Sequence, residues 1–125
     1  MPFRREDAFR YTFEDPLKST FRLIKADEKN IRSSEGEMCI LDISPGGIRM
    51  STTYELPDPE ETSLFLEIDL PINEAALVMR GEVVWKKSYA SSFEYGINFH
   101  NTEKERQMIV AELKIYVKRH LKLGK

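Results

Sequence analysis

The sequence predicts a mainly β fold, either a barrel or a sandwich of short strands, followed by one C-terminal α-helix. Two observations carry this prediction. Apolar and polar side chains alternate in six short segments, and stretches rich in Pro, Gly, Ser and Asp separate these segments. Near the C-terminus the apolar side chains change to helical spacing. Because no helical pattern separates the strand segments, the order of elements disfavours an alternating β–α fold.

The six strand segments differ in how they are expected to be covered. The first places Phe21 and Leu23 on one face, and the second is apolar on both faces, as in a covered strand. In the fifth, Val83 and Trp85 are expected to share the inner face, and Gly81 to mark a bulge or sharp bend. We expect strands at residues 20–25, 37–43, 48–52, 64–70, 77–85 and 93–99.

The two ends of the chain have different patterns. Residues 1–17 are charged and aromatic, and we interpret them as an irregular arm. At the other end, Thr102 and Glu105 have the spacing of a capping box, which predicts that a helix starts there. We therefore expect one domain, made of the arm, a β-barrel over residues 18–100 and a helix over residues 101–123.

Composition limits the classes of function. The chain has 125 residues and a formal net charge of -2, so the molecule as a whole is not basic enough to attract a nucleic acid polymer. Cys39 is the single cysteine, which precludes an internal disulfide and favours a reducing compartment. No signal peptide and no membrane-spanning apolar run is visible, so we expect a cytoplasmic protein without membrane insertion.

The first candidate site is the turn at residues 42–47, with the sequence Asp-Ile-Ser-Pro-Gly-Gly. The Pro-Gly pair is typical of a type II turn, in which Gly46 would adopt a positive φ, while Gly47 would let a ligand approach the backbone. Asp42 and Ser44 are two residues apart and project to the same side. They could simply cap a hairpin. However, a carboxylate within an apolar run needs a donor partner.

The second candidate site is the arginine-rich arm, which carries Arg4, Arg5 and Arg10. Guanidinium groups bind phosphates in a bidentate manner and stack on planar bases. The arm could instead be a solvated charged terminus in which neighbouring acidic side chains pair with the arginines.

Taken together, the two features resemble the PilZ domain family, whose signature is an RxxxR motif near the N-terminus and a DxSxxG motif further along the chain. Asp42, Ser44 and Gly47 match DxSxxG, and residues 81–85 and 95–99 are similar to the later strands of the family. The resemblance extends into the predicted helix and covers nearly the whole chain.

The resemblance implies a six-stranded antiparallel β-barrel with a C-terminal helix, and binding of the bacterial second messenger cyclic di-GMP. Arginine donors suit the O6 and N7 acceptors of guanine, and a carboxylate suits its N1–H and N2–H donors. The implied function is that of a small receptor that changes its surface for a protein partner. The implied ligand-binding residues are Arg4, Arg5, Arg10, Asp42, Ser44, Gly46 and Gly47.

One departure from the family pattern leaves alternatives open. Arg5 and Arg10 are separated by four residues instead of three, so either the arm contains a one-residue bulge or the arginine site is imperfect. In the second case the chain would be a nucleotide-independent adaptor that binds a protein through its helix or an open sheet edge. A hydrolase using Asp42, Ser44 and His100 lacks a supporting motif, so we expect no enzyme, metal or cofactor.

Overall fold

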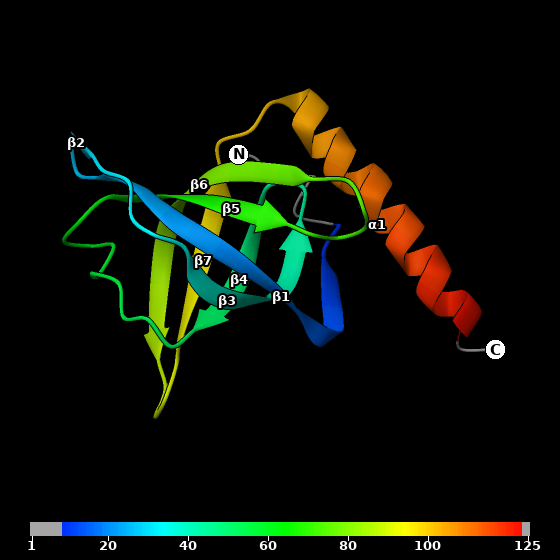
Figure 1. The fold of residues 1–125 in the computed structure, drawn as a ribbon, viewed down its shortest axis with the longest axis horizontal. Coiled ribbons are helices and arrows are strands. Elements are labelled where there is room, and N and C mark those ends of the chain that lie inside the picture. Colours follow the sequence, from blue (N-terminus) through cyan, green and yellow to red (C-terminus); the bar gives the residue numbers. More distant parts are fainter. Residues whose placement is uncertain (1–8, 124–125) are drawn as a thin grey trace.

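The computed structural model of the chain describes residues 9–123 and shows a β-barrel with one helix at its side (Figure 1). Arg4 and Arg5 lie outside the described residues. The elements are β1 (Tyr11–Ala26), β2 (Lys29–Asn30), β3 (Gly36–Ser44), β4 (Gly47–Thr52), β5 (Leu64–Leu70), β6 (Leu77–Ser88), β7 (Phe93–Phe99) and α1 (Glu103–Leu123).

Six of the strands close into an antiparallel barrel. They pair in the order β1-β3-β4-β7-β6-β5, and β5 pairs back with β1. The two-residue strand β2 forms a hairpin with the end of β1, beyond the barrel (Figure 1). The expected fold, a six-stranded antiparallel barrel with a C-terminal helix, is therefore confirmed, and all six predicted strand segments lie in barrel strands.

The barrel interior holds one apolar core, to which each barrel strand contributes buried side chains, as the alternating pattern predicts. Helix α1 adds Ile109 and Leu113, which are both fully buried. The predicted capping box is confirmed: Thr102 Oγ1 accepts a hydrogen bond from the Glu105 N–H (3.1 Å), and the Glu105 carboxylate accepts one from the Thr102 N–H (2.9 Å). No helix within residues 9–123 is long and apolar enough to cross a membrane.

Strand β1 starts earlier than the sequence suggests. The expectation that residues 1–17 are irregular is wrong from Tyr11 onward, because Tyr11 and Thr12 pair with Ile43 and Asp42 of β3. Aromatic packing also holds this segment, since the Tyr11 ring lies 5.8 Å from that of Tyr116 on α1. Pairing with β3 therefore fixes the position of the residue before β1, Arg10.

A β-bulge in β3 sets the direction of Asp42. The pair Ile40–Met50 is followed by the pair Asp42–Arg49, so Leu41 is the extra residue. Ile40 consequently points into the core, while Asp42 points to the outer surface two positions later. This change of face explains why the segment looks apolar on both sides in the sequence.

A second bulge lies in β6, at Val84, whereas the strand register shows no bulge at Gly81, where a bulge or sharp bend was expected. Val83 and Trp85 pair with consecutive residues of β7, so they point to opposite faces. The prediction that Trp85 shares the inner face with Val83 is therefore wrong: Val83 is buried, and Trp85 lies on the outer surface with 40% of its area exposed.

Candidate functional site

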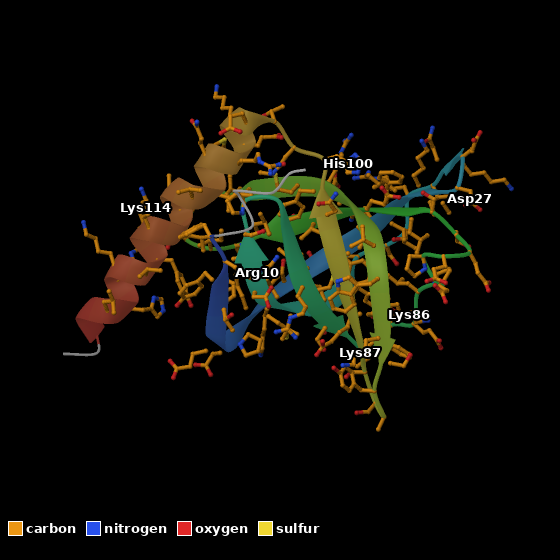
Figure 2. The ribbon with its side chains drawn as sticks, turned by 180° about the vertical axis from the view of Figure 1, so that it is seen from behind. Arg10, Asp27, Lys86, Lys87, His100 and Lys114 are labelled. Atoms are coloured by element: carbon orange, nitrogen blue, oxygen red, sulfur yellow. The ribbon has the colours of Figure 1, made fainter. Side chains whose placement is uncertain are left out.

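The candidate site is an open cleft of about 420 Å³ on the outer surface of the barrel, formed by β3, β4, β6, β7 and the residue before β1. Figure 2 shows Arg10 on the side of the barrel that carries α1, far from Asp27 at the β1–β2 hairpin. The cleft brings together every predicted site residue that the structure describes, namely Arg10, Asp42, Ser44, Gly46 and Gly47. The other lining residues, which the sequence did not single out for binding, include Arg49, Trp85 and Asn98.

Asp42 is the central charged group of the cleft, with only 5% of its area exposed. Its Oδ2 accepts a hydrogen bond from Arg49 Nε at 2.8 Å, and its Oδ1 accepts one from Arg10 Nη1. The carboxylate therefore has two cationic donor partners, as its burial requires. The Arg10 side chain remains 44% exposed, so it can reach both Asp42 and a molecule in the cleft.

Arg49 is the partner of Asp42 that the sequence analysis missed. Its Nη1 also donates to Glu94 Oε1 at 3.2 Å, so two carboxylates fix the guanidinium. The hydrogen bond to Asp42 is the main cause that raises the pKa of Arg49 above its ordinary value. The hairpin register could have identified Arg49 from the sequence. If Ser44 pairs with Gly47 across a two-residue loop, residue 49 must pair with residue 42.

Ser44 and Gly47 form the last pair of the β3–β4 hairpin. The Ser44 side chain is buried, and its hydroxyl donates to the Gly47 carbonyl at 3.5 Å, a long hydrogen bond. A Cβ atom on Gly47 would lie 2.3 Å from the Ile97 carbonyl oxygen. Glycine is therefore required here because the β7 backbone approaches closely, and not because a ligand does, as the sequence suggested.

The turn between β3 and β4 is not of type II. Gly46 has no positive φ, so the prediction for this residue is wrong. The Gly46 carbonyl accepts a hydrogen bond from the Phe99 N–H at 2.8 Å, and this contact with the end of β7 fixes the orientation of the turn. A Cβ atom on Gly46 would lie 3.1 Å from Nη2 at the tip of the Arg106 side chain, so a small shift of that side chain would accommodate it.

Trp85 forms the wall of the cleft on β6. Its indole covers Gly96 on β7, where an added Cβ atom would lie 2.1 Å from Trp85 Nε1. Gly96 therefore provides the space in which the ring rests.

His100, which the hydrolase alternative would need beside Asp42 and Ser44, lies away from them. His100 is not among the residues that line the cleft; its Nε2 lies 3.4 Å from Glu82 Oε1, and Figure 2 shows it apart from Arg10. Within residues 9–123, no group of three or more His, Cys, Asp or Glu side chains is placed to hold a metal ion.

The family model described as "PilZ domain" matches residues 5–114, a range that contains Arg5, Arg10, the whole cleft and more than half of α1. Comparison with curated proteins and with solved structures gives no match.

Proposed function

The chain belongs to the PilZ domain family, which is generally associated with cyclic di-GMP binding, and from this premise we propose that it is a non-enzymatic cyclic di-GMP receptor of the cytoplasm. The observation that carries the proposal is the meeting of Arg10 with Asp42 in one cleft. These residues come from the two motifs of the family signature and are thirty-two positions apart in the sequence. Arg4 and Arg5, outside the described residues, are proposed to contribute further cations.

The chemistry of the cleft suits a guanine dinucleotide. The ligand is a dianion, and Arg10 and Arg49 supply two guanidinium groups within the cleft. A guanidinium can also donate to guanine O6 and N7, while the Asp42 carboxylate can accept from N1–H and N2–H. Adenine offers neither the O6 acceptor nor the N1–H donor, so the cleft is expected to prefer guanine.

Ligand binding at Asp42 requires an exchange of partners. Both carboxylate oxygens already accept hydrogen bonds from guanidinium groups. Arg49 is also held by Glu94, whereas the described contacts of Arg10 include no second carboxylate. A guanine edge would therefore replace Arg10 at Oδ1, and Arg10 would turn to a phosphate or to guanine O6 and N7. This exchange leaves Asp42 paired with Arg49, releases the Arg10 guanidinium for the ligand, and changes the surface that a protein partner meets.

Titration calorimetry of the full chain with cyclic di-GMP tests the proposal, with cyclic di-AMP as the control nucleotide. We expect saturable heat and a thermal shift with the guanine ligand alone. Absence of both at high micromolar cyclic di-GMP would refute the proposed function.

Two variants locate the site. Arg10→Ala should weaken binding at least tenfold, which corresponds to about 1.4 kcal/mol. Arg32→Ala is the matched control, because Arg32 is exposed and contacts Glu67 at 3.6 Å, with no place in the cleft. Equal losses in the two variants would contradict the assignment of the ligand to this cleft.

A second candidate function is nucleotide-independent adaptor activity. A groove of about 440 Å³ runs along α1, lined by apolar side chains that include Phe9, Val117 and Leu121, and bordered by Lys114 and Lys118. This arrangement suits an amphipathic partner helix with acidic side chains beside its apolar face. Capture of one partner in equal amounts with and without cyclic di-GMP, lost in Leu121→Asp, would support this alternative.

A further inference from the structure

We propose that Arg106 of α1 is a further ligand-binding residue, which donates to a phosphate of the ligand at the Gly46 end of the cleft. The inference rests on the proposed function, and it assigns a binding role to a residue outside both signature motifs. Three observations carry it: the charge balance around Asp42, the position of the Arg106 guanidinium beside the β3–β4 turn, and the hydrogen bonds that orient this group.

The described charges around Asp42 balance each other. The guanidinium groups of Arg10 and Arg49 face two carboxylates, because Asp42 accepts from both and Glu94 accepts from Arg49 as well. In the proposed exchange Arg49 keeps its two carboxylate partners, so Arg10 alone is released for a ligand that carries two phosphates. Each phosphate is bound best by a cationic donor of its own. The arm is one source of a second cation, and α1 is another.

The Arg106 guanidinium lies against the β3–β4 turn, at a residue of the cleft. A Cβ atom on Gly46 would lie 3.1 Å from Arg106 Nη2, 3.7 Å from Cζ and 3.8 Å from Nη1, so the whole group is close to the turn. Gly46 also lines the cleft, and as a glycine it places no side chain between the cleft and the guanidinium. Arg106 itself stands just beyond the lining residues. A rotation of its flexible side chain therefore brings Nη2 to a phosphate placed over Gly46.

Two hydrogen bonds orient the guanidinium toward the turn. Arg106 Nη1 donates to Asn101 Oδ1 at 3.1 Å, and Asn101 Nδ2 donates to the Pro45 carbonyl at 3.0 Å. The Asn101 amide is neutral, so this contact positions the guanidinium without compensating its charge. A phosphate bound at Nη2 would then connect the turn, the ligand and α1.

The acidic residues of the first turn of α1 have donors of their own. Glu103 and Glu105 are the two carboxylates that could oppose a phosphate here. Glu105 accepts from the Thr102 N–H in the capping box, and Glu103 accepts from Gln107 Nε2 at 3.4 Å. Both contacts lie on the exposed surface, so water and salt screen these two charges.

Titration calorimetry of the full chain with cyclic di-GMP tests this assignment through two substitutions. Arg106→Ala should weaken binding about tenfold, the effect of one charge-assisted hydrogen bond. Arg106→Lys keeps the positive charge without the planar fork, and should recover a part of that loss. Arg119→Ala is the matched control and should keep the wild-type Kd. Arg119 is an arginine of the same helix that contacts Glu74 at 3.4 Å and has no place in the cleft.

The salt dependence of the Kd separates a phosphate contact from a purely structural role. Raising the salt from about 0.05 M to about 0.3 M should weaken binding less in Arg106→Ala than in the wild-type chain, because one ion pair fewer is screened. If Arg106 only held Asn101 in place, Arg106→Ala and Arg106→Lys would lose affinity alike and keep the wild-type salt dependence. That result would overturn the proposal.

The outcomes also separate this inference from the proposed function. Binding heat in the wild-type chain, together with a wild-type Kd for Arg106→Ala, would overturn the role of Arg106 alone. Absence of heat in the wild-type chain would overturn the proposed function and the role of Arg106 with it. Thermal unfolding of both variants shows whether a loss of binding reflects a loss of fold. If Arg106→Ala is unstable, the affinity and salt dependence of Arg106→Lys decide the role of the charge.

Discussion

Replacement of Asp42 by asparagine removes one negative charge from the cleft and leaves the size of the side chain nearly unchanged. The carboxylate accepts hydrogen bonds from two guanidinium groups, through Oδ1 from Arg10 and through Oδ2 from Arg49. An amide has one acceptor oxygen, and its NH₂ group would face the donors of the second arginine. The variant therefore loses one charge-assisted hydrogen bond in a group that is only 5% exposed.

The expected cost follows from the exposure of the partners. A hydrogen bond to a charged group contributes about 1.5–3 kcal/mol to stability. Because the side chains of Arg10 and Arg49 are 44% and 37% exposed, they can turn to water, which favours the lower end of the range. We expect Asp42→Asn to lower the free energy of unfolding by about 1.5 kcal/mol. For a chain of this length that corresponds to a fall in Tm of about 6 °C.

Urea unfolding at neutral pH measures this change as a shift of the midpoint at constant slope. Asp69→Asn is the matched control, because Asp69 is exposed and its carboxylate accepts a hydrogen bond from the neutral hydroxyl of Thr20 at 3.1 Å. The control should change stability by no more than about 0.5 kcal/mol. If Asp42→Asn were as stable as the wild-type chain, the two ion pairs would not stabilise the cleft and the reasoning would fail.

Three further predictions concern the packing of the barrel. Tyr95→Phe should lower the free energy of unfolding by about 1–3 kcal/mol, because the buried hydroxyl accepts from the Leu56 N–H (2.7 Å) and donates to the Tyr54 carbonyl (3.0 Å); an unchanged urea midpoint would contradict it. Gly47→Ala should cost about 1–3 kcal/mol in thermal unfolding, because its Cβ atom would meet the Ile97 carbonyl oxygen at 2.3 Å, and a wild-type Tm would refute this. Burial raises the pKa of Tyr95, so its contribution to stability is complete below the unfolded pKa of about 10 and is lost as the pH rises through the folded value. The stability difference between wild type and Tyr95→Phe should therefore shrink above pH 10, and a constant difference up to pH 11, about one unit above that ordinary pKa, would refute this cause.

The sequence was sufficient for those parts of the fold that depend on neighbouring residues. Alternation along each segment predicted all six barrel strands, and the Thr102–Glu105 pair predicted the start of the helix. The same local reasoning brought Asp42 and Arg10 forward as candidates. It also required a donor partner for the carboxylate, which the structure supplies.

The missed features depend on contacts between distant parts of the chain. Strand β1 extends to Tyr11 because its first residues pair with β3 and the Tyr11 ring packs against the ring of Tyr116. Bulges at Leu41 and Val84 reverse the alternation within single strands, and their positions follow from the pairing of the neighbouring strands. For this reason periodicity placed Trp85 on the same face as Val83, although it lies on the outer surface.

Closure of the barrel also limits the ways in which another protein can attach to this domain. Each of the six barrel strands has a hydrogen-bonded neighbour on both sides over part of its length. Free stretches remain, because residues 83–88 of β6 pair with β7 alone. Within residues 9–123, β2 is the only strand with a single neighbour, and it has two residues. Recognition by strand addition, in which an extended peptide joins a sheet, is therefore restricted to short stretches of this kind. Over the rest of the closed sheet a partner must read side chains.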